Sequence, residues 1–363
     1  MASPDFDQEH INNLPNGIHQ EIFSYLPLED RKTAALVCRL WEQEAFSVRL
    51  LTNVQLCVTC QLMKSWATTI SVLRNSTRKY RNVIFRLCDG DICSHVEYPL
   101  IVDVLNQFGS TIEGFVMKHG CSANRLKRFA DRMPNLKSMT AYVTELENLR
   151  DEPIKFPEDN ILKNQQFDML RVAPNLQQLR IFFISSKEHV RALEMLKAYA
   201  NQLKMLDLRV LYAWLPIDEL RLEKMEILKL QGGSREFEVH RLHRLLKRLR
   251  ELKAVHLGIN IYQSTLEVIS SSCPKLNTLD IRSDYLEVGA LKHLNNMPNL
   301  QTFMVNRLHE TFLEVSEPVI VGIKELHLLV GSTALSNHAY ANKLAKVFPH
   351  VSEIWLSRGR FRI

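Results

Sequence analysis

The chain contains few of the residues that interrupt, cross-link or anchor a fold. Its 363 residues include 12 glycines, 13 prolines and seven cysteines. Glycine and proline are too sparse for a low-complexity chain, and an odd number of irregularly spaced cysteines favours reduced thiols over a disulfide framework. No stretch approaches the roughly 18 consecutive apolar residues that cross a membrane. These absences predict an unsecreted, globular protein of the cytosol, the nucleus or both.

Excess charge and catalytic motifs are also scarce. The chain has 46 basic and 40 acidic residues and a net charge of +6 at pH 7, an excess too small and too dispersed to require a nucleic-acid partner. The sequence has no Walker lysine loop, no G-x-G-x-x-G, no G-x-S-x-G and no H-E-x-x-H. We therefore expect neither a catalytic site nor a cofactor.

One cysteine pair has a spacing that metal sites use. Cys57 and Cys60 form a C-x-x-C, and Cys88, Cys93 and His95 could complete a set of four zinc ligands. The overall spacing differs from that of a standard zinc finger, and C-x-x-C pairs alone are common. We expect no metal site here.

The most informative segment is residues 11–45, which carry two apolar helical patterns. Leu14 and Pro15 open a helix, Ile18 and Ile22 repeat at i and i+4, and Pro27 forbids continuation. Apolar residues then recur along a second helix, at Ala34, Val37, Cys38 and Trp41. About forty helical residues are near the lower limit for burying their own core. The segment is expected either to dock on a partner or to cap the domain behind it.

This segment resembles the F-box, whose pattern runs leucine-proline, isoleucine-phenylalanine, leucine-proline-leucine-x-aspartate and valine-cysteine-arginine-x-tryptophan. The resemblance implies a helical domain, which we place at residues 8–52, that binds a Skp-family adaptor and through it a cullin and a RING subunit. Val37 and Trp41 are expected partly to hold this domain together. The expected adaptor contacts are Leu14, Pro15, Ile18, Ile22, Phe23, Leu26, Pro27, Leu28 and Trp41.

A second pattern repeats along the rest of the chain. Its unit is apolar-x-x-apolar-x-apolar, as in PNLQQLRIF, PKLNTLDIR and PNLQTFMVN, with helical stretches between the units. Successive anchor residues are 22 to 28 positions apart, except for one interval of 40, and leucine-rich repeats have periods of about 20 to 29. The anchors are Ile112, Leu136, Leu176, Leu203, Met225, Leu252, Leu276, Leu300, Ile323 and Val351.

The repeat resembles a leucine-rich-repeat solenoid, an α/β fold with short parallel strands on the concave side and helices on the convex side. We place it at residues 53–363, with an insertion near 148–165 that contains the acidic stretch NLRDEPIKFPEDN. The insertion is expected to form a surface loop, either a lid over the concave face or a segment with no special role. The competing interpretation of the whole region is an irregular α/β domain.

Solenoid geometry predicts a binding surface. Side chains alternate along a strand, so the residues between the apolar positions line the concave face. Several are basic and suit an acidic or phosphorylated peptide, although each could also belong to a solvated sheet face. The expected target contacts are Arg180, Phe182, Arg209, Lys229, His256, Asp280, Arg282, Met304, His327 and Trp355.

Residues 241–253, RLHRLLKRLRELK, form a basic amphipathic pattern. Alone it could bind nucleic acid, but between two repeat strands it is expected to pack its leucines inward. Together the features predict a non-catalytic substrate-recognition subunit of a ubiquitin ligase of the Skp–cullin–F-box class, which binds a target protein and does not contact membranes. The alternatives are a repeat scaffold or a nucleic-acid-binding protein without a ligase role, and more weakly a protein with a metabolite pocket.

Overall fold

The computed structural model forms two compact units, residues 1–119 with 129–136, and residues 120–128 with 137–363. The expected boundary at residues 52 and 53 lies inside the first unit. The structure describes residues 11–362 except 60, 63–64, 87–93, 122, 144–172, 184–188, 211–215, 233–238, 260, 283–285, 287–288, 307, 309–318, 329–336 and 357–358. The insertion expected near 148–165 lies outside the described residues.

The first unit begins with short helices. Pro15 and Pro27 directly precede the first two α-helices, where the missing proline N–H costs no hydrogen bond because the first N–H groups of a helix have no partner within it. The predicted break at Pro27 is confirmed. The elements are η1 (Ile11–Asn13), α1 (Asn16–Ser24), α2 (Leu28–Ala34), α3 (Arg39–Ala45) and α4 (Val48–Leu51).

Parallel strands follow the helices in the same unit. β1 pairs with β2, and β2 pairs with β3, in register and in chain order. Val83 and Phe85 of β2 are buried, so this sheet also has an apolar face. The elements are β1 (Gln55–Thr59), α6 (Trp66–Arg74), β2 (Asn82–Arg86), α7 (Ser94–Phe108) and η2 (Gly109–Thr111). The next two, β3 (Gly114–Cys121) and α8 (Ala123–Ala130), are each divided between the units.

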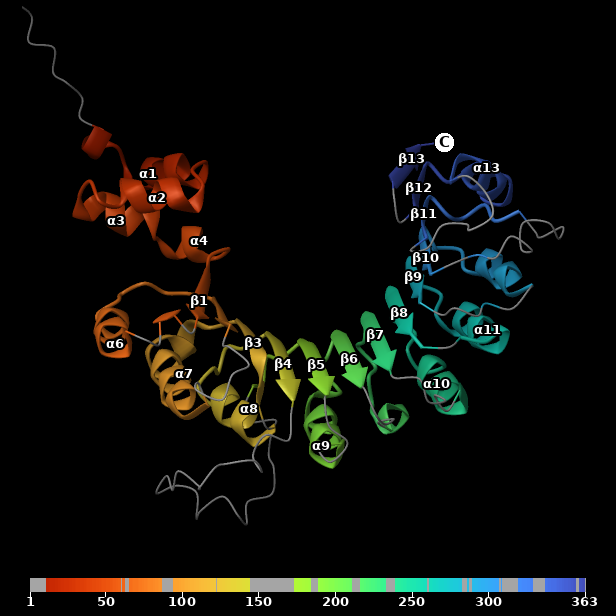
Figure 1. Ribbon diagram of the computed structural model, residues 1–363, viewed down its shortest axis with the longest axis horizontal. Coiled ribbons are helices and arrows are strands. Elements are labelled where there is room, and N and C mark those ends of the chain that lie inside the picture. The colour runs from red at the N-terminus through yellow and green to blue at the C-terminus, as the bar shows by residue number, and fades with distance from the viewer. Residues whose placement is uncertain are drawn as a thin grey trace, which may run out of the picture. The chain divides into compact units, whose positions relative to one another are not determined.

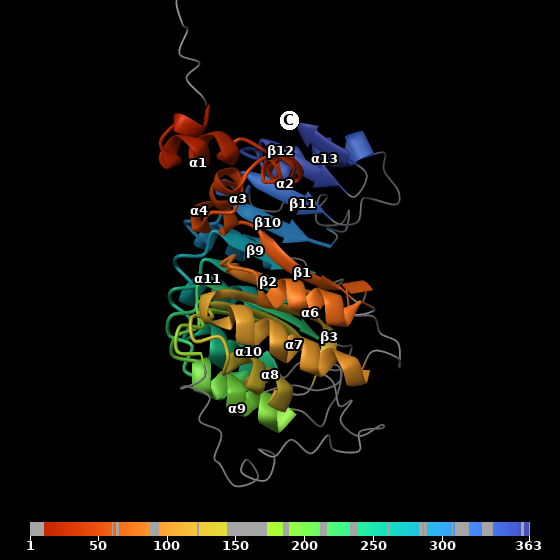
Figure 2. The same cartoon turned by 90° about the vertical axis from the view of Figure 1, so that its left-hand side faces the viewer.

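The second unit repeats one strand per turn. Each strand from β4 to β12 pairs in parallel with the next, and β13 returns antiparallel to β12. In this unit the strands line the inner side and helices cover the outer side (Figure 1), and β9 to β12 stack in chain order (Figure 2). The strands are β4 (Ser138–Val143), β5 (Gln178–Phe183), β6 (Met205–Val210), β7 (Ile227–Gly232), β8 (Ala254–Gly258), β9 (Thr278–Ile281), β10 (Thr302–Val305), β11 (Glu325–Leu328), β12 (Glu353–Leu356) and β13 (Gly359–Arg362).

The connections between these strands are mostly helical. The described helices are α9 (His189–Tyr199), η6 (Ile217–Glu219), α10 (Val239–Leu246), α11 (Gln263–Ser272), η7 (Ala290–Asn296) and α13 (Asn337–Val347). A strand, a helical segment and a parallel strand thus alternate at the predicted period. The expected α/β leucine-rich-repeat architecture is confirmed.

The anchors of the repeat occupy one structural position. Each of the ten lies two residues before its strand and is at most 4% exposed. The asparagine that precedes some anchors has its own role, because Asn135 donates a hydrogen bond to the Ser110 carbonyl and Asn299 donates one to the Pro274 carbonyl, each at 2.8 Å. The proline-asparagine-leucine motif therefore bonds one repeat to the one before it.

The basic pattern at residues 241–253 has a packing role. Its leucines at 242, 245 and 246 are buried, and Arg248 donates hydrogen bonds to the carbonyl oxygens of Asp218 (2.6 Å) and Leu220 (2.7 Å). Arg244 lies 3.1 Å from the Asp218 carboxylate. These contacts fasten α10 to η6, so the inward packing expected of the leucines is confirmed.

Burial in this core gives one cysteine a testable property. Desolvation raises the pKa of the Cys273 thiol to about 12, and only the thiolate reacts readily with alkylating agents. Iodoacetamide at about pH 8 should therefore spare Cys273 in the folded protein and label Cys38, which is partly exposed. Peptide mass spectrometry measures the labelling, and urea should make Cys273 reactive. Equal labelling of both cysteines without urea would contradict the buried position.

Candidate functional site

Exposed apolar side chains gather on η1 and α1. Ile11, Leu14, Ile18 and Ile22, which we call the docking face, are each 38 to 48% exposed. Leu14, Ile18 and Ile22 are four residues apart, so they share one side of α1 and the turn before it. Grouped apolar exposure of this kind marks an interaction surface more often than scattered exposure does.

A second exposed apolar pair lies between α2 and α3. Leu36 is 86% exposed and Val37 is 63% exposed. Val37 was expected to hold the helices together, and its exposure shows that it does not. Leu36 was absent from the expected contacts, because the helical spacing of the sequence favoured Val37 and did not reveal that α2 ends before both residues.

The expected adaptor contacts occupy different environments. Leu14, Pro15, Ile18, Ile22 and Pro27 are exposed, whereas Leu26, Leu28 and Trp41 are partly buried. Phe23 is 3% exposed, and its ring meets that of Trp41 edge to face at 5.6 Å. Phe23 therefore packs inside the helices in the described structure, and its ring is not exposed to an adaptor.

Two polar contacts hold the docking face in place. The indole N–H of Trp41 donates to Asn12 Oδ1 at 2.9 Å, and Nε2 of the buried His19 lies 2.9 Å from the carbonyl oxygen of Ile11. Both contacts fix η1 against the helices behind it. His19 could not be identified from the sequence, because a histidine on an otherwise apolar helix can face either side.

The inner side of the second unit carries the expected target contacts in register. Arg180, Asp207, Lys229, His256 and Asp280 are paired across β5 to β9, and we call this line of residues the central row. It continues across β10 to β12 as Met304, His327 and Trp355. The strand pairing thus brings seven of the ten expected contacts into one row, and it pairs Phe182 with Arg209 in the neighbouring row.

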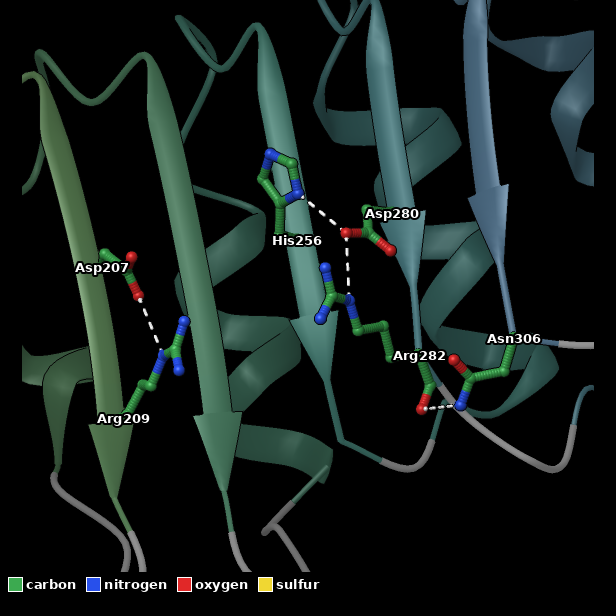
Figure 3. Close-up of polar contacts among 6 residues, drawn as sticks. All are labelled: Asp207, Arg209, His256, Asp280, Arg282 and Asn306. Atoms are coloured by element: carbon green, nitrogen blue, oxygen red, sulfur yellow. Dashed lines mark hydrogen bonds and ion pairs between the residues drawn. The ribbon is translucent and has the colours of Figure 1, made fainter. Parts of the chain in front are cut away.

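The first cation cluster, Arg180 and Arg209, surrounds the carboxylate of Asp207. Asp207 is 3% exposed, and Arg180 Nε lies 2.9 Å from its Oδ2. Arg209 Nε lies 3.9 Å from Asp207 Oδ1 (Figure 3). Neither Arg180 Nε nor Asp207 Oδ1 has a hydrogen-bond partner in the described structure, so these contacts are ion pairs. The Arg209 guanidinium also lies 4.6 Å from the centre of the Phe182 ring, which stacks on Tyr142 at 4.3 Å.

The second cation cluster, His256 and Arg282, surrounds Asp280. Asp280 is 2% exposed; its Oδ2 lies 3.0 Å from His256 Nδ1 and 3.3 Å from Arg282 Nε. Burial opposes ionisation, but the hydrogen bond with His256 and the charge of Arg282 outweigh it and lower the pKa of Asp280. Asn306 donates a hydrogen bond to the Arg282 carbonyl at 2.9 Å and fixes the backbone beside the cluster (Figure 3).

The depressed pKa of Asp280 predicts a loss of stability in acid. A carboxylate whose pKa is lower in the folded than in the unfolded chain stabilises the fold above its ordinary pKa, and that contribution is lost as the pH falls through the folded value. Asp280→Asn should reduce the free energy of unfolding by about 1 kcal/mol at pH 7. Between pH 5 and pH 3 the variant should lose less stability than the wild type does. Urea denaturation tests this, with the exposed Glu223→Gln as control, and parallel pH profiles for all three proteins would contradict it.

The remaining expected contacts differ in surroundings. The Lys229 side chain makes no hydrogen bond or ion pair in the part of the chain that the structure describes. The His327 ring stacks on that of Trp355 at 5.6 Å and 6°, and Met304 is partly buried. Asp207 and Tyr142 lie on the concave face but were not among the expected target contacts, because the sequence does not show that they position neighbouring cations.

The possible zinc ligands are only partly described. Cys57 is a free thiol in β1, whereas Cys60, Cys88 and Cys93 lie outside the described residues. Among the residues that the structure does describe, no three His, Cys, Asp or Glu side chains are grouped closely enough to hold a metal ion. Within the same residues, no helix has the length and apolar character needed to cross a membrane.

Comparisons with known proteins identify the helical segment at the start of the chain. Residues 11–57 match the F-box-like family, and this part of the chain is an F-box-like domain. The fold resembles a chain in the crystal structure of the Rad7 and Elc1 complex in yeast, with a TM-score of 0.52, 14% identity and coverage of 94% of this chain and 81% of that one. No curated protein matches the sequence significantly.

Two further solved structures share less of the fold. The TLR13–ssRNA13 complex matches with a TM-score of 0.38 and 15% identity over 76% of this chain and 40% of that one. The Drosophila Toll–Spatzle complex matches with a TM-score of 0.38 and 14% identity over 76% of this chain and 33% of that one.

Proposed function

We propose that the protein is the substrate-recognition subunit of a ubiquitin ligase of the Skp–cullin–F-box class. The observation that carries the proposal is the exposed docking face within the F-box-like domain. A Skp-family adaptor would cover Leu14, Ile18 and Ile22, since a few apolar anchors commonly supply most of the energy of such an interface. The adaptor in turn would join the chain to a cullin and a RING subunit.

The target protein would bind the concave face of the second unit. The parallel strands place ordered cations and stacked aromatic rings on one surface, and repeat proteins use extended concave surfaces to bind partners. The chain would supply no acid, base or nucleophile to the transfer. Its contribution would be to hold a target lysine near the ubiquitin-loaded enzyme, because proximity alone can raise a reaction rate greatly. Reduced cysteines favour the cytosol or the nucleus as the site of action.

Co-expression with a Skp-family adaptor, followed by size-exclusion chromatography, tests the proposal. We expect the two chains to elute together as one complex. Yeast Elc1 is included as a second bait, which distinguishes a Skp-family adaptor from the protein in the Rad7 complex. If the chain elutes alone while it is folded and soluble, the helices are a cap on a repeat scaffold and the ligase role is wrong.

A further inference from the structure

We propose that the concave face binds an extended acidic segment of the target, with two side-chain carboxylates four residues apart seated on the two cation clusters. This inference rests on the proposed function only in treating the concave face as the surface that contacts the target. It adds a chemical class, a conformation and a spacing.

The first cation cluster suits a single carboxylate. Its two guanidinium charges and the one charge of Asp207 leave one net positive charge. Arg180 and Arg209 direct Nε toward Asp207, and their side chains are 41% and 46% exposed. The terminal N–H groups of both guanidinium groups are therefore accessible to a ligand. Asp207 is a positioning residue, because it holds two like charges close together before any ligand arrives.

The second cation cluster has the same design. Asp280 is buried, whereas the Arg282 side chain is 49% exposed and the His256 side chain is 19% exposed. The charges of Arg282 and Asp280 cancel, so this cluster would hold a carboxylate through the N–H groups of the half-exposed Arg282 guanidinium that do not face Asp280. The charged groups that face His256 are Lys229 on β7, Asp280 on β9 and Arg282, which directly follows β9.

The register of the sheet sets the separation of the clusters. The first cluster lies on β5 and β6 and the second on β8 and β9, three strands further along. Neighbouring strands are about 4.8 Å apart, so the clusters are separated by about 14 Å. An extended peptide rises about 3.3 Å per residue and presents positions i, i+2 and i+4 on one side. Positions i and i+4 therefore match both the distance and the direction.

Lys229 lies between the clusters on β7 and has the same register. An extended peptide would place position i+2 opposite this strand. Since Lys229 makes no ion pair in the described structure, its ammonium group is available to a carbonyl oxygen or a third acidic side chain. The row thus offers three contacts to alternate residues of one peptide.

Charge balance and helix geometry favour an extended carboxylate segment over two related ligands, a phosphorylated segment and a helix. A phosphate group carries about −1.5 to −2 at pH 7, which exceeds the single net positive charge of the first cluster, whereas a carboxylate carries −1 and matches it. A helical ligand would need about nine residues to span about 14 Å, and nine residues make two and a half turns, which places the two side chains on opposite sides. An extended dicarboxylate segment satisfies both restrictions.

The test uses the full chain in complex with its adaptor and degenerate peptide pools that contain two fixed glutamates. Pools with spacings from two to seven residues are compared by fluorescence polarisation at about pH 7, with glutamine in place of glutamate as the baseline. We expect binding to be strongest at a spacing of four. A pool with phosphoserine at the same two positions, and a single-stranded oligonucleotide of similar length, are measured beside them.

Two variants and one control locate the site. Arg180→Ala with Arg209→Ala, and separately Arg282→Ala, should each weaken the spacing-four pool at least about tenfold and remove the spacing preference. Lys224→Ala removes an exposed charge just before β7 and should change binding less than about twofold. Thermal unfolding checks that the fold of each variant is intact.

Several results would overturn the inference. One is that the glutamate pools bind no better than the glutamine baseline, and another is that their affinity does not depend on spacing. A third is that Lys224→Ala loses as much affinity as the cluster variants. A fourth is that the phosphoserine pool binds at least about tenfold tighter than the glutamate pool. Preferential, salt-sensitive binding of the oligonucleotide would also overturn it, in favour of nucleic acid. Adaptor co-elution is recorded for every sample, so failure of the docking face is distinguished from failure of the concave site.

Discussion

Replacing Leu14 and Pro15 together with alanine should abolish co-elution of the chain with a Skp-family adaptor. Leu14 is an exposed apolar residue of the docking face, and Pro15 immediately precedes α1 and fixes how the chain enters the helix. Truncation of a hot-spot residue costs about 2 kcal/mol or more, which weakens binding at least about thirtyfold. Size-exclusion chromatography of the co-expressed proteins reads the loss directly.

The matched control is Val319→Ala with Val321→Ala. Both valines are exposed apolar residues, at 50% and 56%, and they lie in the second unit rather than in the F-box-like domain. This double variant removes comparable apolar surface and should leave the adaptor complex intact. An adaptor complex that survives the Leu14 and Pro15 changes, or that both double variants weaken equally, would contradict the assignment of the docking face.

Gly109→Ala should destabilise the first unit. An ideal Cβ at Gly109, in η2, would lie 2.2 Å from the backbone carbonyl oxygen of Arg132, so the backbone itself would have to move. Forcing extra volume into a packed site costs about 1–3 kcal/mol. The measurement is the urea midpoint of the transition that reports on the first unit, since the two units need not unfold together.

Gly17→Ala is the contrasting substitution. No atom lies within 4 Å of a Cβ added at Gly17, and alanine is favoured over glycine in a helix by up to about 1 kcal/mol. Gly17→Ala should therefore leave the urea midpoint unchanged or raise it. A Gly109→Ala protein as stable as Gly17→Ala would contradict the close approach between Gly109 and Arg132.

The repeat architecture was predictable because its signal is local and recurs. Anchors such as Leu276 and Leu300 each precede a short strand by two residues, and the apolar residue at this position is buried in each of these repeats. The helix break at Pro27 was predictable for the same reason, because proline acts on its own backbone. The period could not specify which loops are long or how residues 144–172 are arranged.

The arrangement of the candidate sites was harder to predict. Phe23 fits the adaptor pattern, yet it is buried, because the side of a helix that faces inward depends on helices elsewhere in the chain. Leu36 was missed for a similar reason. Strand alternation placed Arg180 and Arg209 on the concave face, but their distances to Asp207 depend on strand register and burial, which the sequence does not show.

The carboxylates of the central row also limit how the concave surface can be redesigned. Each strand of the second unit pairs with the strands beside it. A residue on the concave face of one strand could therefore in principle be exchanged without disturbing the other strands. Asp207 links β6 to Arg180 on β5, and Asp280 links β9 to His256 on β8. Altering specificity would therefore require paired exchanges across β5 and β6 or across β8 and β9, whereas β7 can be altered alone.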